Sequence, residues 1–217
     1  KVIELGSGAG HGAASLADGA LDIVAIDRVT PDSASRRSSC RFVRGDLNRI
    51  PLIRRNFDLV VSFQVIEHLE DPTNYIDAIA DLVHLDGTAL LTTPNLLMSD
   101  RVNPYHVHEY RADELADCLR RRFERVEVQG ITASEAVKNY MRERSARIAR
   151  IMKLDPLGLH KRLPRSWIEW LFATFAILVR SQTQRDSGAP DVSWRDFAAG
   201  PADDDCLDLL AICRRPR

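Results

Sequence analysis

The sequence predicts an α/β fold built on a doubly wound, mostly parallel sheet, and three observations support this prediction. Short apolar segments alternate with helical segments up to about residue 93. Such alternation is typical of parallel strands joined by right-handed crossovers, with helices on both faces. A glycine-rich segment, "ELGSGAG", follows directly from the first apolar segment. The chain of 217 residues, 45% hydrophobic and 28% charged, is long enough to bury one sizeable core.

The individual elements are predicted from apolar periodicity and from turn signals. Seven strands are expected, at 2–5, 21–27, 41–46, 57–63, 88–93, 125–130 and 206–215. Three helices are expected among them, at 11–18, 71–87 and 111–123. The second helix has Asp71 as its N-cap, Pro72 at its first position and Gly87 as its stop. Because no core helix separates the last two strands, we expect an antiparallel pair at that edge.

The range 131–205 breaks the alternation, and we expect it to be a helical insertion or lid within a single domain spanning 1–217. Helices are expected over 134–154 and 164–181, followed by a polar loop over 182–204. Residues 134–165 carry nine Lys or Arg against three acids. This charge fits a solvated helix face, a lid over an anionic acceptor, or a peripheral membrane contact through 134–180. The apolar second helix also fits a homodimer face.

The glycine-rich segment Glu4–Gly10 indicates a close approach of backbone and ligand, since glycine adopts positive φ without strain. A tight strand–helix turn with no ligand is the simpler explanation. A dinucleotide site is the rival explanation. Its G-x-G-x-x-G pattern, started at Gly6, would need glycine where the chain has His11. The sequence therefore argues against a nicotinamide cofactor.

This segment and three later ones resemble the class I S-adenosylmethionine-dependent methyltransferases. Asp27 matches the acid that ends the second strand in that family, and Asp46 in "RGDLNRIP" matches the acid near the adenine. "FDLVVSFQVIEHLEDP" is similar to the fourth strand and following loop of a ubiquinone-biosynthesis-like group of small-molecule methyltransferases. The resemblance covers about residues 1–130 and the last strand. It implies a seven-stranded Rossmann-like methyltransferase sheet with an antiparallel last strand, and S-adenosylmethionine as cofactor.

The resemblance also implies which residues bind the cofactor: Glu4, Gly6, Ser7, Gly8, Gly10, Asp27, Arg28, Asp46, Leu47, Ser62 and Gln64. One carboxylate can accept hydrogen bonds from both ribose hydroxyls, which is the role expected of Asp27. Asp46 is expected to accept from the adenine amino group while the Leu47 amide donates to the ring. The alternatives are a helix N-cap at Asp27 and a surface turn at Asp46. Glu4 is expected to organise the glycine loop.

The chemistry expected is methyl transfer, for which the enzyme aligns the reactants and removes a proton from the acceptor. Candidate bases lie in "QVIEHLEDP" and "NPYHVHEYR", and we expect His68 or His106 in that role. An unperturbed imidazole titrates near pH ~6.5, which suits a base at neutral pH. Gln64 is expected to meet the methionine part of the cofactor or the substrate.

A divalent metal is an alternative role for the same loop. Some relatives bind a metal through an acid-x-x-Glu-His motif, but here Gln64 replaces the first acid, so we expect no metal. Glu67 and His68 remain, and His106, His108 or Glu109 could add ligands. The remaining alternative is that Glu67 and His68 only orient the loop by hydrogen bonds.

The predicted function is methyl transfer to a hydroxyl of a saccharide or other small metabolite. "TPN…NPYHVHEYRADEL" resembles bacterial methyltransferases associated with glycan biosynthesis. An RNA or protein methyltransferase and a non-catalytic S-adenosylmethionine-binding subunit are the alternatives. The net charge of −1 gives no general attraction to nucleic acid, and four cysteines without metal-site spacing predict a reduced, cytoplasmic protein. Because Lys1 leads directly into a strand, we expect further residues before it in the full protein.

Overall fold

The computed structural model describes residues 1–20, 22–29, 31, 36–47, 50, 56–99, 103, 105–152 and 192–217. The chain divides into two compact units. The first comprises Lys1–Thr132 and Ala199–Arg217, and the second comprises Ala133–Ala198. The second unit therefore falls inside the range predicted as an insertion. The candidate site belongs to the first unit.

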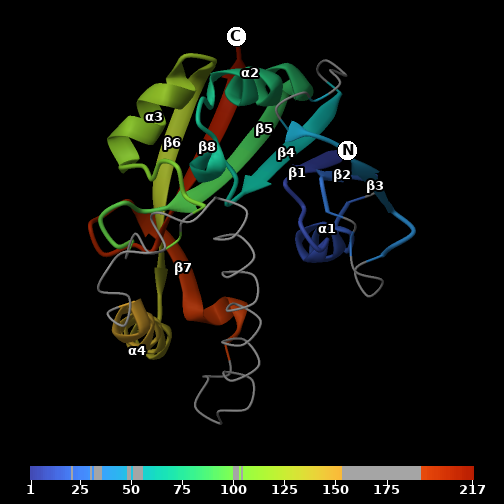
Figure 1. Cartoon of the computed structure of the whole chain (residues 1–217). Helices are drawn as coiled ribbons and strands as arrows, with labels where there is room; N and C mark the ends of the chain where they lie inside the picture. The colour runs from blue at the N-terminus through green and yellow to red at the C-terminus, as the bar shows by residue number, and fades with distance from the viewer. Residues whose placement is uncertain are drawn as a thin grey trace. The chain divides into compact units, whose positions relative to one another are not determined.

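An eight-stranded sheet in the order β3-β2-β1-β4-β5-β8-β6-β7 forms the framework (Figure 1). Its strands are β1 Val2–Leu5, β2 Ile23–Asp27, β3 Cys40–Arg44, β4 Phe57–Phe63, β5 Val83–Pro94, β6 Phe123–Ala133, β7 Phe197–Pro201 and β8 Asp208–Pro216. The first five strands pair in parallel, and β8 lies antiparallel between β5 and β6. The doubly wound, mostly parallel fold and the antiparallel last strand are confirmed.

The prediction of seven strands is wrong by one, because β7 lies in the range expected to be a loop. Its sequence, FAAGP, contains two small residues, a glycine and a proline, and most of it is exposed. Such a segment shows no alternation of apolar and polar residues. Its strand conformation depends on pairing at the sheet edge, which local sequence does not reveal.

Helices cover both faces of the sheet in the first unit. Their bounds are α1 His11–Leu16, η3 Ile66–His68, α2 Thr73–Leu82 and α3 Ala112–Arg120. One buried cluster joins α1 to β1 and β2 through Ala13, Val2, Ile23 and Ala25. A larger cluster packs apolar residues of α2 and α3, such as Ile79 and Leu115, against the opposite face. Alternation along β1 puts Val2 and Ile3 in different clusters, as expected for a sheet covered on both sides.

The predicted end of the second helix is wrong. Helix α2 ends at Leu82 and β5 starts at Val83, so Gly87 lies inside a strand. A Cβ on Gly87 would come within 2.8 Å of the Asp58 carbonyl oxygen, so glycine is required for close backbone packing. At the other end the N-cap is Pro72, one residue later than predicted, and Asp71 Oδ1 accepts a hydrogen bond from Thr73 N at 2.9 Å.

The carboxyl ends of the parallel strands meet at one edge of the sheet. Leu5 pairs with Ile26 near the ends of β1 and β2, and Phe63 pairs with Thr92 near the ends of β4 and β5. The antiparallel β8 starts at the same edge, where Asp208 pairs with Pro94. Ligands of doubly wound sheets bind at this edge.

In the second unit the structure describes α4 Glu135–Met152 and the short helix η5 Trp194–Asp196. A capping box at Ser193 and Asp196 starts η5. The helix expected at 164–181, and with it most of the segment assigned to a lid, dimer or membrane contact, lies outside the described residues. No helix among the described residues is both long and apolar enough to cross a membrane.

Candidate functional site

The loop between β1 and α1 is fixed at its ends and open in its middle. Gly6, Gly8 and Gly10 have φ of +82°, +51° and +88°. A side chain on Gly6 would overlap Cγ2 of Val65, so this position must be glycine for both conformation and space. A Cβ on Gly8, in contrast, would meet no described atom within 4 Å. A left-handed glycine with free space beside it is what a closely approaching ligand needs.

Glu4 is a buried acid beneath this loop. It is 4% exposed, and its Oε2 has no hydrogen-bond partner among the described residues. Burial raises the pKa of Glu4, the nearby Asp27 charge raises it further, and a hydrogen bond from the Ala13 backbone lowers it. A side chain at Gly12 would overlap Glu4 Oε1. The sequence analysis did not single out Gly12, although glycine inside a helix is an available signal.

Asp27, at the end of β2, ties the glycine loop to the sheet. Its Oδ2 accepts from Gly8 N at 2.7 Å, and its Oδ1 accepts from Val29 N at 2.8 Å. The amides of Gly6 and Ser7 both donate to the Ile26 carbonyl. The predicted acid is therefore adjacent to the open glycine, as a shared ligand site requires.

Three further predicted cofactor residues lie near this end of the sheet. Arg28 and Asp46 form an exposed ion pair with 3.0 Å between Arg28 Nη2 and Asp46 Oδ1. Leu47 Cδ1 lies 3.6 Å from the position of a Cβ on Gly6, so its side chain borders the loop. The strands therefore bring Asp27, Arg28, Asp46 and Leu47 to the loop end of the sheet.

Ser62 does not lie at this surface, although it was predicted to bind the cofactor. It is 1% exposed, and its hydroxyl is 2.8 Å from the Tyr75 hydroxyl in the core. Ser62 lies inside β4, so side-chain alternation turns it toward α2. Burial raises the pKa of Tyr75, which keeps this phenol protonated as a hydrogen-bond donor.

Gln64 lies directly after β4 in a left-handed conformation, with φ of +56°. Its N donates to the Thr92 carbonyl at 3.0 Å, and its Nε2 donates to Asp208 Oδ1 at 3.2 Å. Backbone conformations of this kind are rare for non-glycine residues and concentrate at functional sites. Burial raises the pKa of Asp208. The sequence analysis missed Asp208, because a last strand that begins with an acid has no distinctive motif.

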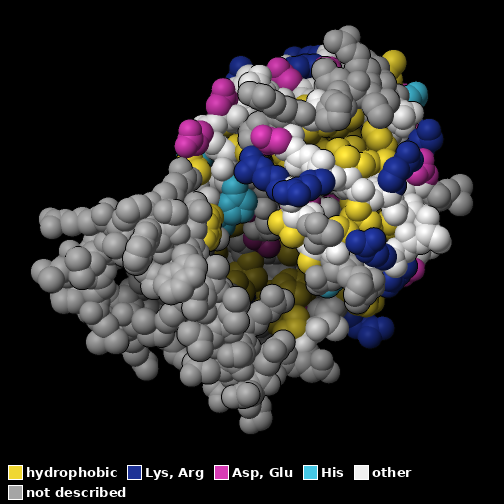
Figure 2. All heavy atoms as spheres, turned by 45° about the vertical axis from the view of Figure 1, so that its right-hand side comes forward, with side chains coloured by type: hydrophobic (Ala, Val, Ile, Leu, Met, Phe, Trp, Pro, Cys, Tyr) yellow, Lys and Arg dark blue, Asp and Glu magenta, His cyan; other side chains and the backbone are white. Residues whose placement is uncertain are grey.

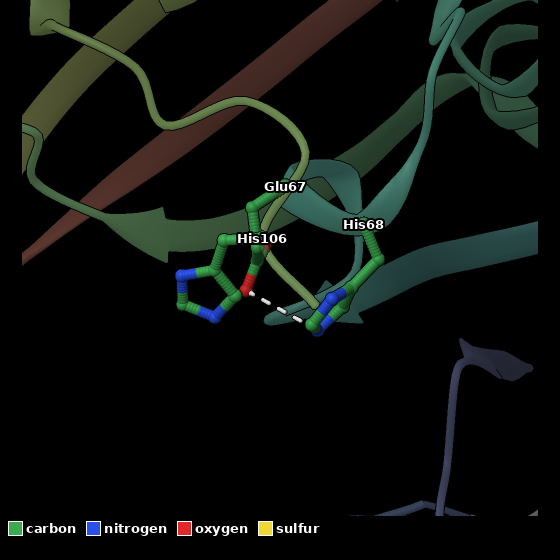
Figure 3. A group of neighbouring side chains, drawn as sticks. All are labelled: Glu67, His68 and His106. Carbon is green, nitrogen blue, oxygen red and sulfur yellow. Dashed lines mark ion pairs between the residues drawn. The ribbon is translucent and has the colours of Figure 1, made fainter. Parts of the chain in front are cut away.

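A second group of side chains lies at the ends of β4 and β5, where η3 presents Glu67 and His68 (Figure 3). Figure 3 shows the Glu67 carboxylate between the His68 and His106 imidazoles. Glu67 is fully buried; its Oε2 accepts from the Thr93 hydroxyl at 3.2 Å, while its Oε1 has no hydrogen-bond partner among the described residues. One ligand atom from each of the three residues lies within 4.8 Å of the others. This set can hold a cation or exchange a proton.

The tautomer of His68 follows from its partner. His68 Nδ1 lies 2.9 Å from the Tyr105 backbone oxygen, which can only accept, so Nδ1 carries the hydrogen. His68 Nε2 is then left with its lone pair, 3.9 Å from Glu67 Oε1. Burial raises the pKa of Glu67, and the neighbouring imidazoles of His68 and His106 lower it. The side chain of His68 is 39% exposed, so a ligand can reach it.

The first strands also border a hollow of about 390 Å³ that is distinct from this site. Its lining includes Ile3, Val24 and Val43 and none of the predicted site residues. Figure 2 shows hydrophobic side chains among Lys and Arg on the described part of one face. Its charged lining residues are Lys1, Asp22 and Arg41, and none of them was predicted to bind or react.

Two comparisons of sequence bear on this geometry. Residues 3–91 match a family model described as a methyltransferase domain. A probable S-adenosylmethionine-dependent methyltransferase of Mycobacterium tuberculosis (strain H37Rv) is 32% identical over 126 residues, 54% of this chain and 46% of the relative. A second, from Mycolicibacterium smegmatis, is 29% identical over 99% of this chain and 81% of the relative. The match thus spans less than half the length of the M. tuberculosis protein.

Solved structures agree in fold. Phosphoethanolamine N-methyltransferase 2 of Haemonchus contortus, solved with S-adenosylmethionine, has a TM-score of 0.59 at 15% identity, covering all of this chain and 48% of that one. An S-adenosylmethionine-dependent methyltransferase from Mesorhizobium loti has a TM-score of 0.56 at 12% identity, covering 99% and 90%. These likenesses show that the chain has the fold of the class I S-adenosylmethionine-dependent methyltransferases.

S-adenosylmethionine is the cofactor that the names of these relatives give, and the loop end of the sheet of this chain suits it. The cofactor carries an ammonium group and ribose hydroxyls, which are hydrogen-bond donors. The buried Glu4 Oε2 has no partner among the described residues, and the Asp27 carboxylate borders the open side of Gly8. Unused acceptors beside an open glycine loop fit a ligand that supplies donors.

Proposed function

We propose that this methyltransferase transfers a methyl group from S-adenosylmethionine to a hydroxyl of a saccharide or another small metabolite. The observation that carries the proposal is the free Nε2 lone pair of His68 beside the buried Glu67 carboxylate. Val65, just before this pair in the sequence, packs directly on Gly6. The segment that carries Glu67 and His68 therefore starts at the glycine loop. A base next to a cofactor loop is the arrangement that hydroxyl methylation requires.

The loop end of the sheet would hold the cofactor. Asp27 would accept from the ribose hydroxyls, and Glu4 would face the methionine part from beneath the loop. Asp46 and Leu47 would bind the adenine, with Asp46 oriented by its ion pair with Arg28. Support for these roles comes from the open space at Gly8 and from the acceptors beside it.

His68 would be the general base. Its Nε2 would take the proton of the acceptor hydroxyl while the oxygen bonds to the methyl carbon. The bond from the cofactor sulfur to that carbon would break at the same time, and its electron pair would stay on sulfur. Glu67 would stabilise the imidazolium that forms, since its Oε1 is 3.9 Å from His68 Nε2. The cofactor itself supplies a methyl group already activated by positive charge.

His68→Gln tests this role. The expected result is a loss of turnover of about 10²–10⁴-fold, the usual contribution of a general base. Binding of S-adenosylhomocysteine, measured by calorimetry, should stay at the wild-type value. Turnover is followed with labelled cofactor and metabolite or glycan extracts as the acceptor pool. Undiminished turnover in the variant would exclude His68 as the base, and binding of NADH in place of S-adenosylhomocysteine would overturn the whole proposal.

A cation at Glu67, His68 and His106 is the second candidate, favoured by the convergence of their ligand atoms within 4.8 Å. Two imidazoles and a carboxylate suit a divalent transition metal. The two candidates differ in one measurement, which is turnover after treatment with a chelator. The base mechanism predicts unchanged turnover, whereas a metal mechanism predicts its loss and its recovery on adding the metal back.

A further inference from the structure

The segment between β5 and α3 contains a buried acid that the proposed function does not use. Glu109 is 8% exposed, and its Oε2 has no partner among the described residues. Its Oε1 accepts from the Ser99 hydroxyl at 2.7 Å and lies 2.6 Å from His106 Nδ1. A buried carboxylate with one oxygen that lacks a hydrogen-bond partner is costly, so its presence here calls for a functional reason.

The hydrogen bonds that start at Glu109 have defined directions. The carboxylate accepts, so His106 Nδ1 donates to it and His106 Nε2 is an acceptor. Asn103 Nδ2 donates to that Nε2 at 2.8 Å. The orientation of the Asn103 amide is set at its other end, where Oδ1 accepts from Tyr105 N at 3.0 Å. A backbone N–H can only donate, so the amide cannot be reversed without losing this bond.

The same peptide segment then reaches His68. The Tyr105 backbone oxygen accepts from His68 Nδ1 at 2.9 Å. The chain of contacts therefore runs from Glu109 through His106, Asn103 and Tyr105 to His68. His106 and Asn103 each accept one hydrogen bond and donate one, and Tyr105 does the same with its backbone C=O and N–H. Glu109 only accepts, and the Nδ1–H of His68 is the last donor.

Backbone contacts fasten this segment next to His68. Val107 N and His108 N donate to the Glu67 carbonyl at 2.8 and 3.2 Å. They hold the middle of the segment against η3, while Asn103 and Glu109 fix the two sides of His106. The Tyr105 carbonyl is thus held opposite His68 by more than its own hydrogen bond.

We propose that Glu109 and Asn103 are positioning residues, which act through His106 and the backbone on either side of the Tyr105 Cα to hold His68 as the Nδ1-protonated tautomer. Free histidine in water favours the other neutral tautomer, with the hydrogen on Nε2. The lone pair that accepts a proton must be on Nε2, which faces Glu67. The proposal rests on the role of His68 in the proposed function, but the tautomer can be measured without turnover.

The experiment is a long-range ¹H–¹⁵N NMR measurement of the imidazole tautomers in the wild type, Glu109→Gln, Asn103→Ala and His108→Gln. In the wild type we expect the Nδ1-protonated form of His68. Asn103→Ala removes the link between His106 and Tyr105, and Glu109→Gln removes the acceptor that orients His106. Both variants should therefore shift His68 toward the Nε2-protonated form.

His108→Gln is the matched control. It changes a histidine of the same segment whose ring contacts Glu114 on α3, at 2.6 Å, and takes no part in the chain of bonds. Its His68 tautomer should equal that of the wild type. Turnover in the two test variants should fall by about 10-fold or more, within the range of effects on a general base, while affinity for S-adenosylhomocysteine stays unchanged.

An Nε2-protonated His68 in the wild type would overturn the proposal, and so would an unchanged tautomer in both test variants. These outcomes are separate from failure of the proposed function, which would show as undiminished turnover in His68→Gln or as absence of S-adenosylhomocysteine binding. Amide exchange or circular dichroism on each variant shows whether it is folded. If Asn103→Ala fails to fold, Glu109→Gln, which keeps the side-chain shape, decides the matter.

Discussion

Asp27 illustrates how one residue can serve both the loop and a ligand. Its two carboxylate oxygens accept from Gly8 N and Val29 N, so the acid organises the loop before any ligand binds. A carboxylate oxygen can accept more than one hydrogen bond, which leaves capacity for the cofactor. Loss of Asp27 should thus act on both loop order and cofactor affinity.

The first prediction concerns Asp27→Asn. Replacing the charged acceptor should weaken binding of S-adenosylhomocysteine by about 10–100-fold, because hydrogen bonds to a charged group contribute roughly 1.5–3 kcal/mol. Calorimetric titration measures the affinity. Asp22→Asn is the control, since Asp22 lies before β2 and pairs with Arg41 at 3.4 Å. Equal affinities of the two variants would contradict the assignment.

The second prediction concerns Glu4 and pH. The pKa of Glu4 in the folded protein is raised above 4.5, chiefly by burial. Above that pH the unfolded chain loses the proton while the folded chain keeps it, so the free energy of unfolding decreases as pH rises through the folded pKa. Glu4→Gln should remove this decrease of the unfolding free energy with pH. Urea unfolding without ligand, repeated at a series of pH values, measures it. Glu124→Gln, at an exposed acid paired with Arg215, should retain the wild-type slope.

If the free energy of unfolding changed with pH by the same slope in the wild type and in Glu4→Gln, Glu4 would not be the titrating group. Asp58, Asp71 and Asp196 cannot mimic the effect. Their pKa values are lowered from 3.8, so their contribution is lost only as pH falls below that value.

At the scale of elements, α1 is constrained by the acid beneath it. Gly12 would normally weaken a helix by roughly 1 kcal/mol relative to alanine. Here a methyl group at this position would overlap Glu4 Oε1, so glycine is required despite its low helix propensity. The position of the Glu4 carboxylate thus decides which residue can occupy the first turn of α1.

The third prediction is that Gly12→Ala destabilises the protein, in the opposite direction to helix propensity. We expect a lower melting temperature, because overpacking typically costs about 1–3 kcal/mol. Gly19→Ala is the control, since a Cβ there meets no described atom within 4 Å. In the Gly12→Ala/Glu4→Ala double variant the loss should be partly reversed. Higher stability of Gly12→Ala alone would refute the clash.

The elements also show which local patterns are informative. The strand at 57–63 has the predicted bounds, because its central apolar residues, 59–61, are typical of a buried parallel strand. The segment at 83–87 was assigned to a helix because Gly87 was interpreted as the helix stop. It is the start of β5, where Phe57 pairs with Val83 and the register then shifts. Pairing with a distant strand overrides the local signal.

At the scale of the whole molecule, chain topology brings distant segments together at one edge of the sheet. Glu67 and His106 are nearly 40 positions apart and lie within the same cluster. The strands that carry them are neighbours, β4 and β5, so the loops after both strands meet. The sequence analysis expected both loops to contribute candidates because both contain histidines, but it could not choose between His68 and His106.

The sequence by itself determined the strand–helix alternation, the antiparallel last strand, the glycine loop and the acids after it, because each depends on local periodicity or on residue type. Only the tertiary structure decided that Ser62 is buried, that Asp208 faces Gln64 and that Glu109 contacts His106. It also distinguished the histidines, because a tautomer depends on the hydrogen-bond partner that folding places beside each nitrogen. Such partners are set by the packing of loops from separate strands, and no local pattern encodes them.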